Sequence, residues 1–318
     1  MTDAATKAIP QRVLALRSLF SKNLTYRTLE ERFRYLLERR RVELEAGIIA
    51  EARCIALIGA AGSGKTTAAE HLFATQPDLV LHDPDGPRLD VASFQVPSPA
   101  TLKFVGQTAL ATLGFELQRD KSAQIIWSMV KGHLNARRTL FMHIDEAQDL
   151  IRLQTPKELN AVVSTLKSLL QQKSWPVGLI LTGTAELKTL INHDAQLARR
   201  VYPIEFARLN VLLDSDRILK VLKHYSEAAG IDLTPTFLTP ELAARLAHAA
   251  DREFGLMIEM IIAALEEAME AGATELALAH FTAMFRKRTG CVDGLNVFVV
   301  DDFERIDVRR LLDDGEDT

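Results

Sequence analysis

G-A-A-G-S-G-K-T-T, residues 59–67, matches the pattern G-x-x-x-x-G-K-[ST], with its fixed positions at Gly59, Gly64, Lys65 and Thr66. A short apolar run, Cys54–Ile58, precedes the stretch and is typical of a buried strand, and helix formers follow it. Glycines let successive backbone N–H groups turn inward around an anion, and the following helix directs its positive end at the same place. The stretch therefore predicts a nucleotide-binding phosphate loop.

We predict ATP and Mg²⁺ as the cofactors of this loop. Lys65 is expected to reach the β- and γ-phosphates, and the Thr66 hydroxyl is expected to bind Mg²⁺. The alternative is a glycine-rich turn that matches by chance, which the flanking strand and helix disfavour. The residues predicted to bind the cofactors are Gly59, Ala60, Ala61, Gly62, Ser63, Gly64, Lys65, Thr66, Thr67 and, from a second motif, Asp145.

The second motif is an apolar run, residues 140–144, that ends in Asp145 and Glu146. Asp145 is placed at the carboxyl end of a central strand, where it can hold Mg²⁺ through water, and Glu146 can polarise the attacking water. A strand that ends in Asp-Glu is weak evidence alone, but it becomes strong evidence when it follows a phosphate loop. His143 is expected to be a core residue.

Two further polar groups complete the predicted catalytic set. Thr182 or Thr184, at the end of the apolar run 177–184, could bind the γ-phosphate or the attacking water; a strand-end turn is the alternative. Arg199 and Arg200 precede the expected last strand, 204–206, and could act in trans as an arginine finger. Arg199 is preferred, and surface arginines are the alternative. The predicted catalytic residues are Glu146, Lys65, Thr182, Arg199 and Arg200.

Composition and charge limit the classes of protein that fit. The chain has 318 residues, 47% hydrophobic and 25% charged, as in an ordinary globular protein. Its two cysteines fit no metal site, and no apolar run is long enough for a membrane span, so we expect a cytoplasmic protein without membrane association. The net charge is −4, but residues 301–318 alone hold eight acidic and three basic residues, so binding to nucleic acid stays open.

Four regions are predicted from periodicity and breakers: an N-terminal helical extension over 1–45, an α/β nucleotide-binding core over 46–209, a helical lid over 210–289 and an acidic tail over 290–318. Residues 1–10 are expected to be disordered. Strands are expected at 79–82 and 89–96, with a turn over 84–87 between them. Thr101 is expected to cap the next helix, and Trp127 is expected on the buried face of the helix after that. Arg39, Arg40 and Arg41 lie either on a solvated helix face or against phosphate or another subunit. The tail either docks a partner or packs on its own domain.

The order of phosphate loop, Asp145-Glu146, polar strand end, Arg pair and helical lid resembles the AAA+ ATPases over residues 46–289. The resemblance implies a parallel five-stranded sheet between helices, followed by a small all-helical lid, with nucleotide at a subunit interface. It also implies that Glu146 is the catalytic base, Thr182 is sensor 1 and Arg199 is the finger. The sensor 2 stretch, Gly255–Ile258, holds no arginine; Arg252 lies upstream.

Within AAA+ proteins, the chain resembles transposition regulators of the TniB/TnsC type, relatives of the Mu B protein. The resemblance is carried by the stretches Ile144–Gln148, Val96–Pro99, Leu181–Thr184 and Leu197–Arg200. It implies ATP-dependent assembly on double-stranded DNA as a ring or filament, with a transposase and a target-selection protein as partners. It places DNA contacts after Pro99, at Thr101 and Lys103 with Arg119 and Lys121, where surface charges are the alternative.

The leading hypothesis is thus an ATP-dependent, DNA-binding AAA+ regulator of transposition. A helicase loader shares the ATPase core and is the first alternative. A nucleotide-switched signalling or scaffold protein without DNA is the second. Glu146 disfavours an inactive ATPase, because a degenerate site commonly lacks that acid.

Overall fold

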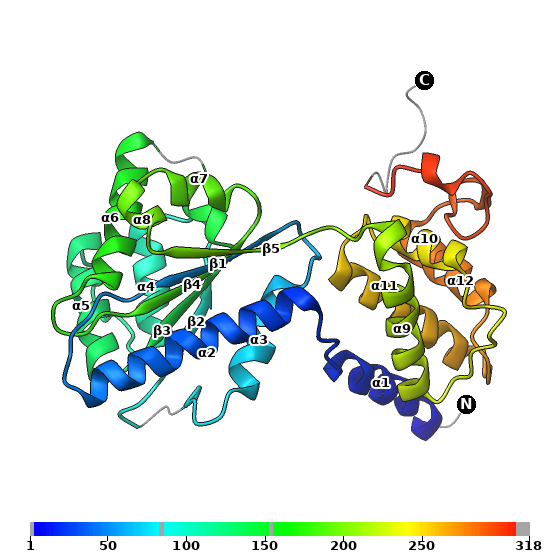
Figure 1. Cartoon of the computed structure of the whole chain (residues 1–318), viewed down its shortest axis with the longest axis horizontal. Coiled ribbons are helices and arrows are strands. Elements are labelled where there is room, and N and C mark those ends of the chain that lie inside the picture. Colours follow the sequence, from blue (N-terminus) through cyan, green and yellow to red (C-terminus); the bar gives the residue numbers. More distant parts are fainter. Residues whose placement is uncertain (1–2, 83–85, 153–154, 310–318) are drawn as a thin grey trace. The chain divides into compact units, whose positions relative to one another are not determined.

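The computed structural model describes residues 3–82, 86–152 and 155–309 and divides into two compact units (Figure 1). An α/β unit holds residues 22–60 and 65–206, and a helical unit holds the N-terminal 21 residues, residues 61–64 and the chain from 207 onward. The structure therefore divides the expected N-terminal extension between the units: α1 (Asp3–Ser18) belongs to the helical unit and α2 (Leu24–Glu45) to the α/β unit.

A five-stranded parallel sheet in the order β2-β3-β4-β1-β5 forms the centre of the α/β unit. This confirms the predicted fold class. The strands are β1 (Cys54–Gly59), β2 (Val91–Gln95), β3 (Phe141–Asp145), β4 (Gly178–Gly183) and β5 (Val201–Phe206). Strands covered on both faces read as continuous apolar runs, which is why β1, β3 and β4 are visible in the sequence.

Helices follow or precede each strand of this unit. The aromatic ring of Phe33 on α2 lies 5.0 Å from that of Phe141 at the start of β3, so α2 packs on the sheet. The other helices are α3 (Lys65–Thr75), α4 (Leu102–Thr112), α5 (Ala123–Ala136), the 3₁₀ helix η1 (Ala147–Leu150), α6 (Pro156–Leu170), α7 (Leu187–Asn192) and α8 (Ala195–Ala198). Trp127 is buried on α5, as expected.

The strand expected over residues 79–82 does not form. Val80 instead donates its backbone N–H to a carboxylate oxygen of Asp90 at 2.8 Å and accepts the N–H of that residue at 2.8 Å. The segment is therefore held as a loop beside the start of β2. Two of the four residues of the turn predicted over 84–87 lie outside the described residues, which omit 83–85.

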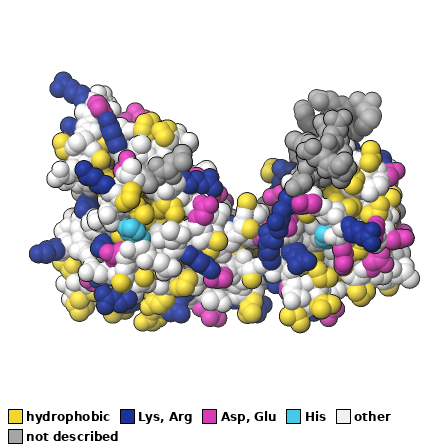
Figure 2. All heavy atoms as spheres, turned by 90° about the horizontal axis from the view of Figure 1, so that it is seen from above, with side chains coloured by type: hydrophobic (Ala, Val, Ile, Leu, Met, Phe, Trp, Pro, Cys, Tyr) yellow, Lys and Arg dark blue, Asp and Glu magenta, His cyan; other side chains and the backbone are white. Residues whose placement is uncertain are grey.

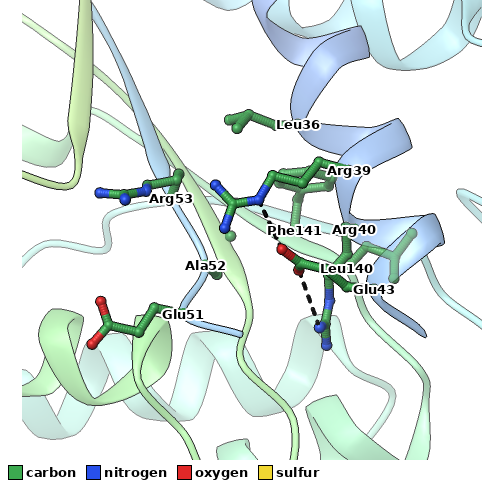
Figure 3. Close-up of a pocket in the computed structure, with 10 residues that line it drawn as sticks. Leu36, Arg39, Arg40, Glu43, Glu51, Ala52, Arg53, Leu140 and Phe141 are labelled. Carbon is green, nitrogen blue, oxygen red and sulfur yellow. Dashed lines mark hydrogen bonds and ion pairs between the residues drawn. The ribbon is translucent and has the colours of Figure 1, made fainter. Parts of the chain in front are cut away.

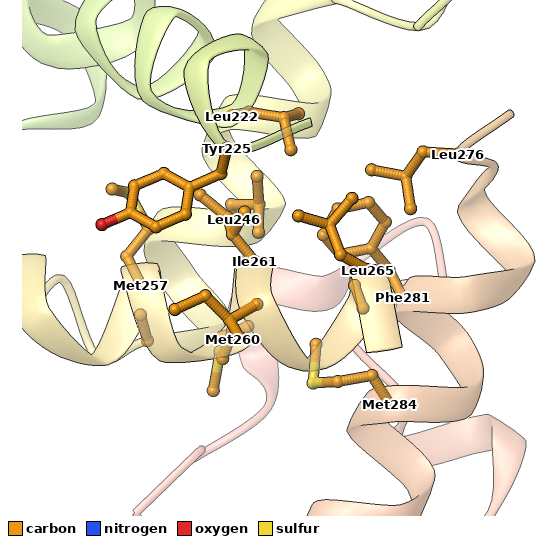
Figure 4. Packing of buried hydrophobic residues seen from close by; sticks show 14 of the residues in the cluster. Leu222, Tyr225, Leu246, Met257, Met260, Ile261, Leu265, Leu276, Phe281 and Met284 are labelled. Carbon is orange, nitrogen blue, oxygen red and sulfur yellow. The ribbon is translucent and has the colours of Figure 1, made fainter. Parts of the chain in front are cut away.

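The helical unit has its own apolar core (Figure 4). Tyr225, Met257 and Phe281 are among its buried side chains. Its elements are α1, α9 (Val211–Ala229), α10 (Pro240–Ala249), α11 (Phe254–Glu270), α12 (Leu278–Thr289), and the 3₁₀ helices η2 (Asp293–Leu295) and η3 (Phe303–Arg305). Residues 61–64 group with this unit, and the Leu256 N–H donates to the Gly62 carbonyl at 2.8 Å.

Helix α1 contributes to the same core, although disorder was expected over residues 1–10. The helix begins at Asp3, and its side chains Val13 and Leu16 are buried in the cluster. The Tyr225 hydroxyl donates to the Leu19 carbonyl at 3.1 Å, which fixes the chain directly after α1 against α9. The expectation of disorder was wrong for residues 3–10.

The segment after α12 packs on its own unit. Val297 and Phe298 are buried, and the Arg245 guanidinium donates to the carbonyls of Val297 and Val300 at 2.6 and 2.8 Å. Of the two alternatives for the tail, packing on its own domain is the one that applies to residues 291–300. Residues 310–318, with four of the eight acidic residues, lie outside the described part. None of the helices described is long and apolar enough to cross a membrane.

Candidate nucleotide site

The two motifs meet at the carboxyl edge of the sheet. Because the strands are parallel, the ends of β1, β3 and β4 lie side by side, and β4 pairs Leu181 with Ile144 and Thr182 with Leu57. The Thr66 hydroxyl donates to Oδ2 of Asp145 at 2.9 Å. The Thr182 hydroxyl donates to Oδ1 of the same carboxylate. The structure thus brings together three predicted residues that lie far apart in the sequence.

The phosphate loop has a backbone that suits its predicted role. Gly62 and Gly64 have φ angles of +77° and +91°, in the left-handed region where a side chain is strained. Helix α3 begins at Lys65, directly after the loop, and its first N–H groups lack partners within the helix. The Lys65 ammonium donates to the Ala60 carbonyl at 2.7 Å and is largely buried. These features fit a triphosphate.

The oxygen atoms beside the loop also fit a magnesium ion. Mg²⁺ prefers hard oxygen ligands and is commonly held by one or two protein oxygens together with phosphates and water. The Thr66 hydroxyl and the Asp145 carboxylate are adjacent and supply such oxygens. Within the described residues no cluster of three or more His, Cys, Asp or Glu side chains offers another metal site.

His143 is buried, as expected, but it also links the site to the sheet. Its Nε2 lies 3.2 Å from Thr182 Oγ1, and its Nδ1 lies 2.8 Å from Ser93 Oγ on β2. Since Thr182 already donates its proton to Asp145, His143 must donate from Nε2 and accept from Ser93 at Nδ1. Burial lowers the pKa of His143 to about 4, which keeps the ring neutral in this chain of hydrogen bonds.

Glu146 is held by its own backbone and by a residue that the sequence did not single out for a role. Its φ angle is +53°, and its N–H donates to Asp145 Oδ1 at 3.0 Å. Its carboxylate accepts a hydrogen bond from the Gln148 side chain, whose Nε2 lies 2.5 Å from Oε2 of Glu146. The only trace of this contact in the sequence is an amide residue two positions after Glu146, and it does not reveal the partner.

The two candidate fingers have different surroundings. Arg200 donates to both carboxylate oxygens of Glu51, from Nε at 3.0 Å and from Nη2 at 2.8 Å. Arg199 is exposed, and its Nε donates to the Ala195 carbonyl at 3.2 Å. Arg199 is therefore the arginine that can reach another molecule without breaking an ion pair.

The basic helix face of α2 is engaged within the chain. Arg39 donates to Glu43 at 2.7 Å and Arg41 to Glu38 at 3.0 Å. Arg40 is buried over the Trp175 ring, at 5.0 Å from its centroid, and burial lowers the pKa of its guanidinium. Figure 3 shows Glu43 between Arg39 and Arg40 in a small pocket of about 20 Å³, which is far too small for a nucleotide.

The four candidate DNA contacts come from two neighbouring segments. Thr101 caps α4 by accepting the Phe104 N–H at 3.2 Å, as expected from the sequence. Lys103 forms an ion pair with Asp120 at 2.5 Å, which joins the start of α4 to the loop that carries Arg119 and Lys121. The Lys103 ammonium lowers the pKa of the Asp120 carboxyl.

Charge on the visible face of the α/β unit is mixed. Figure 2 shows Lys and Arg side chains among acidic and hydrophobic ones on that face, in place of one continuous basic tract. A DNA surface on that face would therefore rest on a few phosphate contacts.

The parallel sheet and the helices around it have the AAA+ P-loop fold. Residues 49–191 match a family model described as an AAA domain, AAA_22. The matched segment contains the phosphate loop, Asp145, Glu146 and Thr182, and it ends before Arg199. A comparison with curated protein sequences gives no match.

Solved structures with the same fold include archaeal Cdc6 and ORC proteins. Cdc6p from Pyrobaculum aerophilum is 16% identical with a TM-score of 0.59, covering 89% of this chain and 70% of that chain. ORC1 from Aeropyrum pernix, solved with DNA, is 14% identical with a TM-score of 0.58, covering 83% and 64%. ORC2 from Aeropyrum pernix, solved with ADPNP and ADP, is 17% identical with a TM-score of 0.60, covering 87% and 71%. These likenesses show the AAA+ fold.

Proposed function

We propose that the chain is an ATP-dependent, DNA-binding AAA+ ATPase that regulates DNA transposition. One observation carries the ATPase part: Thr66, Thr182 and the backbone N–H of Glu146 all converge on the Asp145 carboxylate at the edge of the sheet that also carries the phosphate loop. An arrangement built from three separate segments is characteristic of a catalytic site, because a chance motif match would not assemble it.

Each residue has a defined role in the proposed reaction. Lys65 binds the β- and γ-phosphates, and Thr66 and Asp145 hold Mg²⁺, which neutralises charge on the transferring group. Glu146 accepts the proton of the attacking water, and Thr182 orients that water or the γ-phosphate. Arg199 acts on the site of a neighbouring subunit, which makes hydrolysis depend on assembly.

The DNA and transposition parts rest on the resemblance to TniB and TnsC proteins. The ion pair of Lys103 with Asp120 supports a composite contact surface with Thr101, Arg119 and Lys121, because it holds the two segments together. We propose that the protein assembles as a ring or filament on double-stranded DNA and recruits a transposase and a target-selection protein. The ORC1 likeness shows that this fold occurs in a protein solved with DNA.

A second candidate is a replication initiator or helicase loader. The fold likeness to Cdc6p and ORC2 favours it, with TM-scores of 0.59 and 0.60. It would use the same ATP site and the same assembly, but its partner would be a helicase. Pull-down with a transposase or a replicative helicase from the same cell separates the two candidates.

Glu146→Gln tests the ATPase assignment. Loss of the general base should lower kcat by about 10²- to 10⁴-fold, while binding of ATP stays within a few-fold of the unchanged protein. Single-turnover hydrolysis and nucleotide titration measure the two quantities. Glu31→Gln, an exposed position on α2, is the matched control and should change neither. Equal hydrolysis in Glu146→Gln and the control would overturn the assignment.

A further inference from the structure

We propose that Gln148 is a positioning residue that holds the Glu146 carboxylate against the end of β4. The inference rests on the proposed ATPase function and adds to it a residue that acts through the catalytic base. Gln148 lies on η1, two residues after Glu146, and its side chain is 2% exposed.

The side-chain amide of Gln148 joins two groups that are far apart in the sequence. Its Nε2 donates to Oε2 of Glu146 at 2.5 Å, and its Oε1 accepts the backbone N–H of Thr184 at 3.0 Å. This orientation is chemically required. A backbone N–H can only donate and an ionised carboxylate can only accept, so the amide oxygen must face Thr184 and the amide nitrogen must face Glu146.

The end of β4 is shaped to receive this amide. A Cβ atom added to Gly183 would lie 2.5 Å from Oε1 of Gln148 and 3.3 Å from its backbone nitrogen. Any side chain at position 183 would therefore displace Gln148 or the strand end. The Thr182-Gly183-Thr184 segment thus supplies a hydroxyl to Asp145, space for Gln148 and an N–H that orients Gln148.

The same contacts explain why a glutamine is suited to this position. Asparagine is one methylene shorter and cannot span the two partners. Glutamate cannot donate to a carboxylate and would add a like charge beside it. Glu146 itself has left-handed backbone geometry, which persists only where the surrounding structure holds it, and the Gln148 amide is one such contact. With Oε2 bound to the amide, Oε1 would be the oxygen that accepts the proton of the attacking water.

Gln148→Met tests the proposal, because methionine has a similar length and makes neither hydrogen bond. Misplacement of a catalytic group by about 1 Å costs up to 10²-fold in rate. We expect kcat to fall by about 10- to 100-fold while the Kd of a non-hydrolysable ATP analogue stays within about twofold. Gly183→Ala should lower kcat in the same way. Gln124→Met, at an exposed position on α5, is the control.

Combination with Glu146→Gln separates positioning from a general structural role. If Gln148 acts through Glu146, adding Gln148→Met to Glu146→Gln should lower kcat no further. Should Gln148→Met fail to fold, Gln148→Asn gives the same test with a smaller polar residue. The inference would be overturned by an unchanged kcat in a folded Gln148→Met variant. It would also be overturned if the kcat losses of the two single variants multiply in the double variant. Equal hydrolysis in Glu146→Gln and the unchanged protein would instead overturn the proposed function.

Discussion

Arg199 and Arg200 are neighbours in the sequence with different prospects for catalysis. Arg200 is held by Glu51 through two hydrogen bonds, whereas Arg199 is exposed and uses its Nε on a carbonyl of its own helix. A finger that acts in trans must be free to contact a phosphoryl group on another subunit. We therefore propose Arg199 for this role.

Arg199→Ala should lower hydrolysis by assembled protein by about 10³-fold or more, as for other arginine fingers. Arg200→Ala removes an ion pair whose Glu51 partner is half exposed, so its main effect should be a loss of stability below about 1 kcal/mol. Mixing Arg199→Ala with Glu146→Gln should restore part of the ATPase activity. In mixed assemblies the first variant supplies the catalytic base and the second supplies the arginine finger. The assignment is wrong if Arg200→Ala is the more impaired variant in the ATPase assay.

The two motifs could be predicted because each is local in the sequence. The phosphate loop and the pair Asp145-Glu146 are contiguous, and their spacing placed both at strand ends. The roles of Gln148 and His143 could not be predicted, since their partners come from other strands: Thr184 on one side, Thr182 and Ser93 on the other. A single sequence does not show which polar residue faces which across a sheet.

At the scale of elements, the loop after α1 is attached to α9 through one buried hydroxyl. Tyr225 is 1% exposed, it donates to the Leu19 carbonyl, and burial raises its pKa to about 12 from 10.0. The tyrosine ionises at a lower pH in the unfolded state than in the folded state. The stability that this difference contributes is therefore fully present below pH 10 and is lost as the pH rises toward 12. This difference in the pKa of Tyr225 corresponds to at most about 3 kcal/mol in the free energy of unfolding.

Tyr225→Phe should therefore lower the free energy of unfolding by about 1 kcal/mol at pH 7, where the hydrogen bond is lost and nothing ionises. The difference between the two proteins should shrink above pH 10 and reverse as the pH approaches 12, because phenylalanine cannot ionise. Urea unfolding at a series of pH values measures this difference in the free energy of unfolding. A difference that stays constant from pH 7 to pH 11 would show that Tyr225 is not buried as described.

Helices and strands could be predicted where the hydrophobic periodicity of the sequence agrees with the packing in the fold. The helices of the lid follow their periodicity, and α4 begins at the expected cap, Thr101. Two predictions failed because tertiary contacts decided the outcome. Residues 79–82 have the composition of a strand, but Val80 is bonded to Asp90 outside the sheet. The polar start of α1 looked disordered, yet Val13 and Leu16 bind the helix to a core formed far along the chain.

We expect assembly of the whole molecule on DNA to depend on the triphosphate. In the proposed function, nucleotide completes a site that also needs Arg199 of a neighbour, so ATP should favour the oligomer. The proposed DNA contacts are to phosphates, from Lys103, Arg119 and Lys121. Binding should therefore weaken steeply with salt and depend little on base sequence.

The most direct test is electron microscopy of the purified protein on double-stranded DNA with ATP, with ADP and with a non-hydrolysable ATP analogue. We predict rings or filaments on DNA with ATP or the analogue and dispersed protein with ADP. Glu146→Gln should stabilise the assemblies formed with ATP. Monomers in every condition, with no protein on the DNA, would contradict the proposed ATP-dependent assembly on DNA.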